Sequence, residues 1–208
     1  GIRDSSVTGV QTCALPISAY VHRLPPCNDA CPAGEDIQGW LYHAEARDYE
    51  IAWRHLVRQN PLPAIMGRVC YHPCQSACNR LQVDREVGIN SVERFLGDEA
   101  LKQGWKFDPP VAATGKKVLV VGSGPSGLSA AYHLAMLGHH VVIRDSAEKP
   151  GGMMRYGIPA YRLPRDVIDA EINRILELGV DLQCNSKVTD LPAAFAEGFD
   201  AVFLAVGA

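Results

Sequence analysis

The sequence has no surplus of charge of either sign, and it has no long hydrophobic run. Its 208 residues carry 20 basic and 23 acidic side chains, a formal net charge of −3, with no basic patch. Surfaces that neutralise phosphates carry a clustered basic excess, so we expect neither nucleic acid nor an anionic membrane as a partner. The longest purely apolar runs lie at 118–121 and 201–206. Both fall far short of the ~20 residues that cross a bilayer, which excludes a membrane-spanning helix.

The amino terminus also lacks a secretory leader, because no basic start precedes an apolar stretch and a small-residue cleavage site. A disulfide framework is therefore not expected, and a reducing, cytoplasmic compartment is favoured. Seven cysteines are nevertheless present, and five of them lie between positions 27 and 78. Such clustering is typical of metal ligation.

The two ends of the sequence differ from the rest. Residues 7–17, VTGVQTCALPI, resemble a translated sequencing-adapter read and have no helical or alternating apolar period. We expect residues 1–18 to be non-native and exclude Cys13 as a ligand; an ordinary disordered tail is the alternative. At the other end FLAVGA directly follows an apolar, strand-like run, which we interpret as a truncation.

Composition changes once along the chain, which predicts two domains. Residues 19–106 contain most cysteines and show helical periods, whereas residues 116–208 alternate strand and helix patterns. Between them FDPPVAATG, residues 107–115, has the paired prolines and final glycine of a linker. The expected fold class is α plus α/β: a small all-helical domain, then a partial doubly wound, Rossmann-like domain.

Apolar spacing locates the expected elements. In the first domain Ile37, Trp40, Leu41 and Ala44 mark one face of a helix. Further helices are expected at 49–58 and around 92–101. In the second domain a strand at 117–121, a helix at 126–137 and a strand at 140–144 form a parallel βαβ unit. A helix at 165–178, a short strand at 180–182 and a buried strand within 199–207 follow.

The turn of the βαβ unit matches G-x-G-x-x-G at Gly122, Gly124 and Gly127. These glycines serve the tight turn, the backbone approach to a pyrophosphate and the helix-to-strand contact, in that order. The helix amino terminus then faces the phosphates. Asp145, at the end of the second strand, is placed to accept both ribose hydroxyls. The motif predicts a dinucleotide site; the alternative is a plain turn with a solvated surface acid.

The clustered cysteines have spacings close to one helical turn: Cys27-x3-Cys31 and Cys70-x3-Cys74-x3-Cys78. A helix from Pro73 onward would place Cys74 and Cys78 on one face. Thiolate-rich sites select zinc or iron–sulfur clusters, and five cysteines exceed one tetrahedral zinc. An iron–sulfur cluster is the favoured prediction, with zinc and unligated thiols as alternatives.

Four segments together resemble the NAD(P)H-dependent glutamate synthase small-subunit family, whose architecture also forms the amino-terminal part of dihydropyrimidine dehydrogenase. They are PPCNDACPAGEDIQGWL, GRVCYHPCQSACNR, INSVERFLGDEAL and GGMMRYGIPAYRLPRDVIDAEINRILELGV. The resemblance covers roughly residues 20–208. It implies two [4Fe–4S] clusters in the helical domain, FAD in the next domain and NAD(P)H in a further domain that this chain lacks.

Carried over by position, the resemblance implies that Cys31, Cys70 and Cys74 hold one cluster, with Glu93 as an oxygen ligand. Cys27 and Cys78 would belong to a second cluster, whose other ligands lie upstream in many members, where this chain has the adapter-like stretch. Glu93 could equally close a helix-capping box on the Asn90 N–H.

His72 lies between two expected ligands and could tune the cluster through a hydrogen bond.

Arg162 has two possible roles in the predicted flavin domain. Its guanidinium could contact FAD, or it could form an ion pair with Asp166 at i+4. The residues that the resemblance implies for FAD are Gly122, Ser123, Gly124, Pro125, Ser126, Gly127, Asp145, Gly151, Gly152, Met153, Arg162 and the backbone near Val188.

The sequence therefore predicts part of an electron-transfer flavoprotein. In the intact protein a reduced nicotinamide would reduce FAD, and the electrons would pass through the clusters to a larger catalytic or acceptor redox subunit. No side chain needs to act as acid, base or nucleophile, so no catalytic residue is expected. The alternatives are a non-enzymatic adaptor stapled by iron–sulfur or zinc, and NAD(P)H instead of FAD in the Gly122 site.

Overall fold

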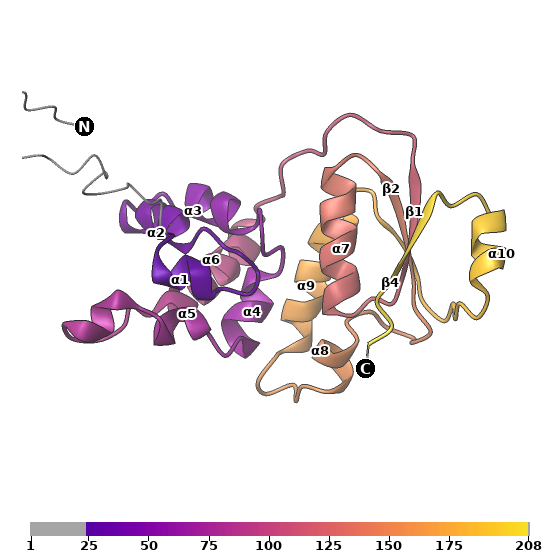
Figure 1. Ribbon diagram of the computed structural model, residues 1–208. Helices are drawn as coiled ribbons and strands as arrows, with labels where there is room; N and C mark the ends of the chain where they lie inside the picture. Colours follow the sequence, from indigo (N-terminus) through magenta and orange to yellow (C-terminus); the bar gives the residue numbers. More distant parts are fainter. Residues whose placement is uncertain (1–23, 208) are drawn as a thin grey trace, which may run out of the picture.

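The computed structural model describes residues 24–207. The predictions for residues 1–18 and for Cys13 fall outside this range. A helical part is followed by a sheet with helices on both faces (Figure 1), which confirms the expected fold class. The helical part contains α1 Pro26–Ala30, α2 Ile37–Glu45, α3 Tyr49–Leu56, α4 Pro63–Val69, α5 Pro73–Ser76, the 3₁₀ turn η1 Asn79–Gln82 and α6 Ile89–Gln103.

The helices begin and end where local chemistry places them. The Asp36 carboxylate caps α2 by accepting the Gly39 N–H, and Ile37 and Trp40 of that helix are buried. Gly104, at a φ of 68°, ends α6. The backbones of α4 and α6 approach closely, because a Cβ at Gly97 would lie 2.3 Å from the Ala64 nitrogen. These two helices form the tightest packing of the helical part.

The second part is a parallel sheet with strand order β3-β2-β1-β4. In Figure 1, α7 and α9 lie between the sheet and the helical part, and α10 lies on the other side. The expected βαβ unit is thus present. The elements are β1 Lys117–Val121, α7 Pro125–Met136, β2 His140–Arg144, α8 Met153–Tyr156, α9 Arg165–Leu176, β3 Asp181–Gln183, α10 Leu191–Ala196 and β4 Ala201–Leu204.

One continuous apolar core crosses from the helical part into the sheet part. Trp53 of α3 stacks on Phe107, with ring centroids 5.6 Å apart and planes at 10°. Phe107 in turn contacts Tyr132 of α7. Because aromatic burial of this kind is a large stabilising term, the two parts are packed against each other as one body.

Two expectations about elements are wrong. The last strand, β4, is not buried: Phe203 and Leu204 are 41% and 55% exposed, because β4 is an edge strand of the described sheet. The helix after Pro73 ends at Ser76, so Cys74 and Cys78 do not share a helix face. Among residues 24–207, no helix has the length and apolarity to cross a bilayer.

Candidate functional site: a thiol-lined cavity beside a glycine-turn cavity

Three of the predicted cysteine ligands line a single cavity of about 240 Å³ in the helical part: Cys31, Cys70 and Cys74. The carboxylates of Glu93 and Glu35 line the same cavity. The thiols are distributed along its wall, and within residues 24–207 no three His, Cys, Asp or Glu side chains form a group that could hold a single metal ion. All six described cysteines are free.

Three separate helices supply these thiols. Cys31 and Cys70 follow the last residues of α1 and α4, and Cys74 lies in the first turn of α5. Burial raises the pKa of the Cys74 thiol to about 11, and the neighbouring thiols and Glu93 add to the rise. Burial likewise raises the pKa of Cys31 and Cys70. The site therefore suits a cationic centre, which binds the thiolate and offsets the cost of deprotonation.

The Glu93 carboxylate is part of a buried network that the sequence did not reveal. The Asn60 amide donates from one nitrogen to both Glu93 Oε1, at 2.8 Å, and Glu35 Oε1, at 2.9 Å. The Trp40 indole donates to the other oxygen of Glu35 at 3.3 Å. Burial, followed by the repulsion of Glu35, raises the pKa of Glu93 to about 9. Two acids are thus held beside the thiols.

The capping alternative for Glu93 is wrong. The Asn90 N–H donates to Gln75 Oε1 at 2.9 Å, and α6 begins one residue earlier, at Ile89. The contact between Asn90 and Glu93 joins the two side chains at 3.4 Å. Glu93 is 6% exposed and faces the thiol cavity, where it is available as a ligand.

His72 contacts Cys70 mainly through its backbone. Its N–H donates to Cys70 Sγ at 3.2 Å, and its ring Nδ1 lies 3.1 Å from the Cys70 carbonyl oxygen. A positive φ of 44° makes this loop possible. His72 therefore hydrogen-bonds the Cys70 sulfur through its main chain, whereas its imidazole contacts the Cys70 carbonyl oxygen.

Cys27 and Cys78 lie away from the thiol cavity. Cys27 belongs to α1 and Cys78 follows α5, and these two helices pack together. Burial raises the pKa of Cys27, and the charge of Cys78 contributes to the rise, so the two thiols are neighbours. The structure thus sorts the five clustered cysteines into a group of three and a group of two.

A second cavity, of about 690 Å³, opens at the carboxyl ends of β1 and β4. Eight of the residues expected to contact a dinucleotide line it: Gly122, Gly124, Pro125, Ser126, Asp145, Gly152, Met153 and Val188. A Cβ at Gly124 would meet nothing within 4 Å, whereas a Cβ at Gly127 would lie 1.9 Å from the Gly122 carbonyl oxygen. Gly124 therefore leaves room for a ligand and Gly127 lets the helix approach the strand.

Asp145 is more constrained than the motif suggested. One carboxylate oxygen accepts from both the N–H, at 2.6 Å, and the hydroxyl, at 2.5 Å, of Ser123; the other accepts the Ala147 N–H at 2.8 Å. Burial opposes ionisation, but these hydrogen bonds outweigh it and lower the pKa of Asp145. The ionised acid holds the glycine turn in place besides lining the cavity.

The remaining predicted residues lie behind or beyond this cavity. Gly151 donates its N–H to the Ser123 carbonyl at 3.0 Å, which joins the two loops. Arg162 is exposed, is not among the lining residues and makes no ion pair to Asp166 within the described chain. The structure therefore shows Arg162 neither at the dinucleotide cavity nor paired with Asp166.

Sequence reasoning missed two arginines that organise the loop below the dinucleotide cavity. Arg155 is 8% exposed, donates to the Pro150 carbonyl and pairs with Asp169. Arg165 donates to the Met154 and Ile158 carbonyls. Spacing alone gives no signal for such contacts. Lys187, which lines the cavity, was also missed.

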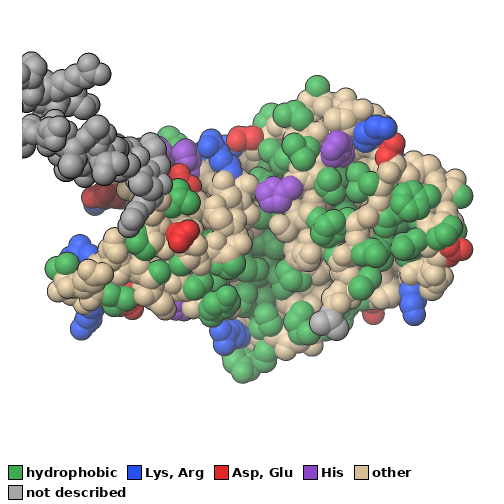
Figure 2. Space-filling view, viewed as in Figure 1, with side chains coloured by type: hydrophobic (Ala, Val, Ile, Leu, Met, Phe, Trp, Pro, Cys, Tyr) green, Lys and Arg blue, Asp and Glu red, His purple; other side chains and the backbone are tan. Residues whose placement is uncertain are grey.

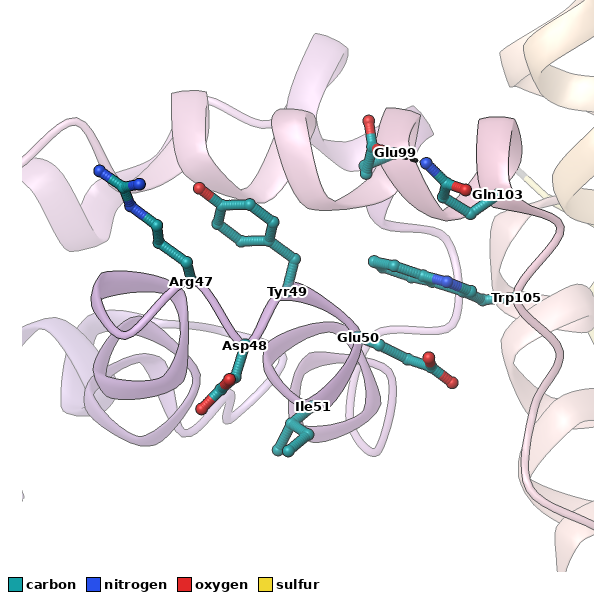
Figure 3. A pocket seen from close by; sticks show the side chains of 8 residues that line it. All are labelled: Arg47, Asp48, Tyr49, Glu50, Ile51, Glu99, Gln103 and Trp105. Atoms are coloured by element: carbon teal, nitrogen blue, oxygen red, sulfur yellow. Dashed lines mark hydrogen bonds between the residues drawn. The ribbon is translucent and has the colours of Figure 1, made fainter.

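A third hollow, shown in Figure 3, lies between the start of α3 and the end of α6. It is open, and none of the predicted site residues line it. Glu50 in its wall already pairs with Arg54, and Glu99 accepts from Gln103. We assign no role to this hollow.

Comparison with known proteins finds two matching regions in this chain. Residues 21–105 match the family described as dihydropyrimidine dehydrogenase domain II, 4Fe-4S cluster, and residues 120–171 match the NAD(P)-binding Rossmann-like domain. The chain thus combines a region similar to a 4Fe-4S domain with a region similar to a dinucleotide-binding domain. More particularly, it is a relative of glutamate synthase and of the dihydropyrimidine dehydrogenase subunits, which confirms the resemblance.

Three relatives give the extent of this similarity. The beta subunit of NADP(+)-dependent formate dehydrogenase from Moorella thermoacetica is 35% identical, over 88% of this chain and 29% of the relative. The NAD-dependent dihydropyrimidine dehydrogenase subunit PreT of Salmonella typhimurium is 38% identical, over 78% and 40%. Glutamate synthase [NADH] of Schizosaccharomyces pombe is 38% identical, over 76% and 8%. The chain spans less than half the length of each.

Proposed function

We propose that this chain carries electrons between a flavin and an iron–sulfur cluster within a larger NAD(P)H-dependent oxidoreductase. The observation that supports this most directly is the wall that the two cavities share. Pro125, in the first turn of α7, lines both the thiol cavity and the dinucleotide cavity. Cofactors in the two cavities would therefore be separated by a single helical turn.

The residues of the thiol cavity fit a [4Fe–4S] cluster. Cys31, Cys70 and Cys74 would hold three of its irons, and the Glu93 carboxylate is the available fourth ligand. Burial raises the pKa of the Cys74 thiol, and binding to a cluster would favour the deprotonated form of this thiol. Cys27 and Cys78 would contribute to a second cluster, with further ligands from outside residues 24–207.

The glycine-turn cavity would hold FAD. Gly124 lets the backbone approach the pyrophosphate, and the first amides of α7, a helix of 12 residues, face it. Asp145 lies where the adenosine ribose would bind, and the Gly152 and Met153 turn lines the cavity beside Gly124. Arg162 would reach FAD only through a movement of its exposed loop.

When bound, the flavin supplies the exchange between hydride and single electrons, and the cluster supplies single-electron transfer. The chain's own residues position the two groups: α7 separates them, and the Asn60 network holds Glu35 and Glu93 beside the thiols. No side chain in either cavity is required as an acid or base. The acceptor would be a larger redox subunit.

The face in Figure 2 shows acidic and basic side chains interspersed, which gives no indication of a nucleic-acid surface.

Anaerobic purification followed by absorbance spectroscopy, iron analysis and chromatography of released cofactor tests the proposal. We expect flavin bands, broad cluster absorption and released FAD. A colourless protein with stoichiometric zinc would instead establish the adaptor alternative, and released NAD(P)H would assign the glycine turn to a nicotinamide.

The thiol cavity can be tested in the same preparation with a matched pair of cysteine variants. We expect Cys74→Ser to lose most of the cluster absorption and bound iron, because a buried wall thiol is removed. Cys184→Ser changes a cysteine that lies outside both cavities and should keep both. Equal iron in the two variants would contradict the assignment of the cavity.

A further inference from the structure

A buried carboxylate from the dinucleotide-binding part reaches into the cluster-binding part. Glu171 of α9 is 0% exposed. Its two oxygens accept the backbone N–H groups of Ala64, at 3.0 Å, and Ile65, at 2.9 Å. Both amides belong to the first turn of α4, which lies beside α9 (Figure 1). The contact joins residues more than a hundred positions apart in the chain.

This carboxylate takes the place of a helix cap. The residue before α4 is Leu62, which offers no side-chain acceptor, so the first amides of α4 would otherwise be unpaired in the core. An acid at a helix amino terminus also interacts favourably with the helix dipole. The nearest cation is Arg174, whose Nη1 lies 3.8 Å from the Glu171 carboxylate. The α4 amides are therefore the principal partners of Glu171.

Helix α4 connects this contact to the thiol cavity. It is only seven residues long, and the residue that follows its last turn is Cys70. On its other side α4 is fixed to α6, because Arg68 pairs with Asp98 at 2.6 Å and Gly97 permits close backbone contact. A short, straight helix held at its first turn transmits that position to the thiol at its end.

We propose that Glu171 is a positioning residue for electron transfer between the two cavities. By binding the start of α4 from the dinucleotide-binding part, it holds the Cys70 wall of the thiol cavity against the first turn of α7. The inference rests on the proposed function, since it assigns a role within the transfer between the same two sites.

The test compares Glu171→Gln with Glu177→Gln in protein that contains flavin and cluster. Glu177 follows α9 on the surface and pairs with Lys106 at 3.3 Å, so it provides a matched loss of one charge. A light flash with EDTA as the electron donor reduces the flavin, and bleaching of the cluster absorption then reports transfer of one electron. Hydrogen exchange of the Ala64 and Ile65 amides reports their hydrogen bonds to Glu171.

We expect Glu171→Gln to keep its flavin and iron, because neither cavity includes this side chain. Exchange of the two amides should be about tenfold faster, because the glutamine side chain keeps only one acceptor oxygen where the carboxylate has two. Transfer to the cluster should be at least about tenfold slower, since small displacements near a reacting centre have effects of this size. Glu177→Gln should match the wild type in every measurement.

Unchanged transfer in a coloured Glu171→Gln protein would overturn the inference and leave the proposed function standing. A colourless wild type would overturn the proposed function instead. If Glu171→Gln does not fold, Glu171→Asp, which keeps the charge on a shorter stem, should show both effects in the same direction. The wild type gives one more test, because the Ala64 and Ile65 amides must exchange more slowly than those of Glu50 and Ile51, which begin α3 without a side-chain cap.

Discussion

At Gly124, folding and ligand binding make separate demands on one residue. Its φ of −70° is open to any residue, and an added Cβ would meet no protein atom. The Cβ would instead enter the dinucleotide cavity, where the backbone is expected to approach a pyrophosphate. We therefore expect Gly124→Ala to keep its stability within about 0.5 kcal/mol but to lose most bound flavin, as measured by thermal unfolding and flavin content.

Gly88→Ala is the control for this change. Gly88 has a φ of −71° and only Ser91 atoms near an added Cβ, at 3.8 Å, and it lies outside both cavities. The control should keep both stability and flavin. A Gly124→Ala protein with full flavin content would show that no ligand approaches this backbone.

Asn60 bridges two buried acids, and its removal should lower the stability of the protein. One amide nitrogen serves Glu35 and Glu93, while its oxygen accepts the Leu62 N–H at 3.1 Å. Asn60→Ala leaves three buried polar groups without this partner, so we expect a loss of roughly 2–4 kcal/mol in the free energy of unfolding of the metal-free protein. Urea unfolding measures it. Asn173→Ala, an exposed position on α9, should change by less than about 0.5 kcal/mol.

At the scale of elements, the contact between α4 and α6 depends on the absence of a side chain. A Cβ at Gly97 would lie 2.3 Å from the Ala64 nitrogen and 2.6 Å from its Cα, both backbone atoms that cannot rotate away. We expect Gly97→Ala to destabilise the protein by about 1–3 kcal/mol in urea unfolding. Gly88→Ala, just before the same helix, should be neutral, and equal stability of the two variants would refute this packing.

The elements that local pattern predicts correctly are those whose own residues determine them. Helix α2 has its cap and its buried face in one stretch, residues 36–45, and the βαβ unit around Gly122 has its strand, turn and helix in one run. The failures occur where a distant group decides. Gln75 accepts the Asn90 N–H and removes the capping box, and the edge position of β4 in the sheet leaves that strand exposed.

The same distinction applies to the site. The glycine turn follows from one contiguous motif, and most of its residues line one cavity. The acids beside the thiols could not be predicted, because Asn60 joins Glu35 and Glu93 across 25 and 33 positions. The Glu171 contact to α4 spans 107 positions. Neither contact has a periodicity or motif in the sequence.

At the scale of the whole molecule, the interface between the two parts is itself part of the site. The apolar core runs through it, Pro125 borders both cavities, and Glu171 bridges α9 and α4. A domain boundary drawn on composition separates residues that contact one another here. A break at this interface would thus disturb both cavities without changing any residue that lines them.

The interface should also make the stability of the protein depend on pH. Burial raises the pKa of Glu171 to about 7, and the Ile65 and Ala64 amides, with Arg174 and Arg68, offset only part of this. Its usual value is 4.5. Because the folded state favours the protonated acid, the stabilisation is complete below pH 4.5 and is lost as the pH rises through 7.

The difference between wild type and Glu171→Gln isolates this acid from all others, since glutamine does not titrate. We expect the free energy of unfolding of the wild type, relative to the variant, to fall by about 2–3 kcal/mol between pH 5 and pH 8. Urea unfolding at several pH values measures it. A flat difference for Glu171→Gln would mean that this carboxylate is solvated, and that α4 and α9 do not enclose it.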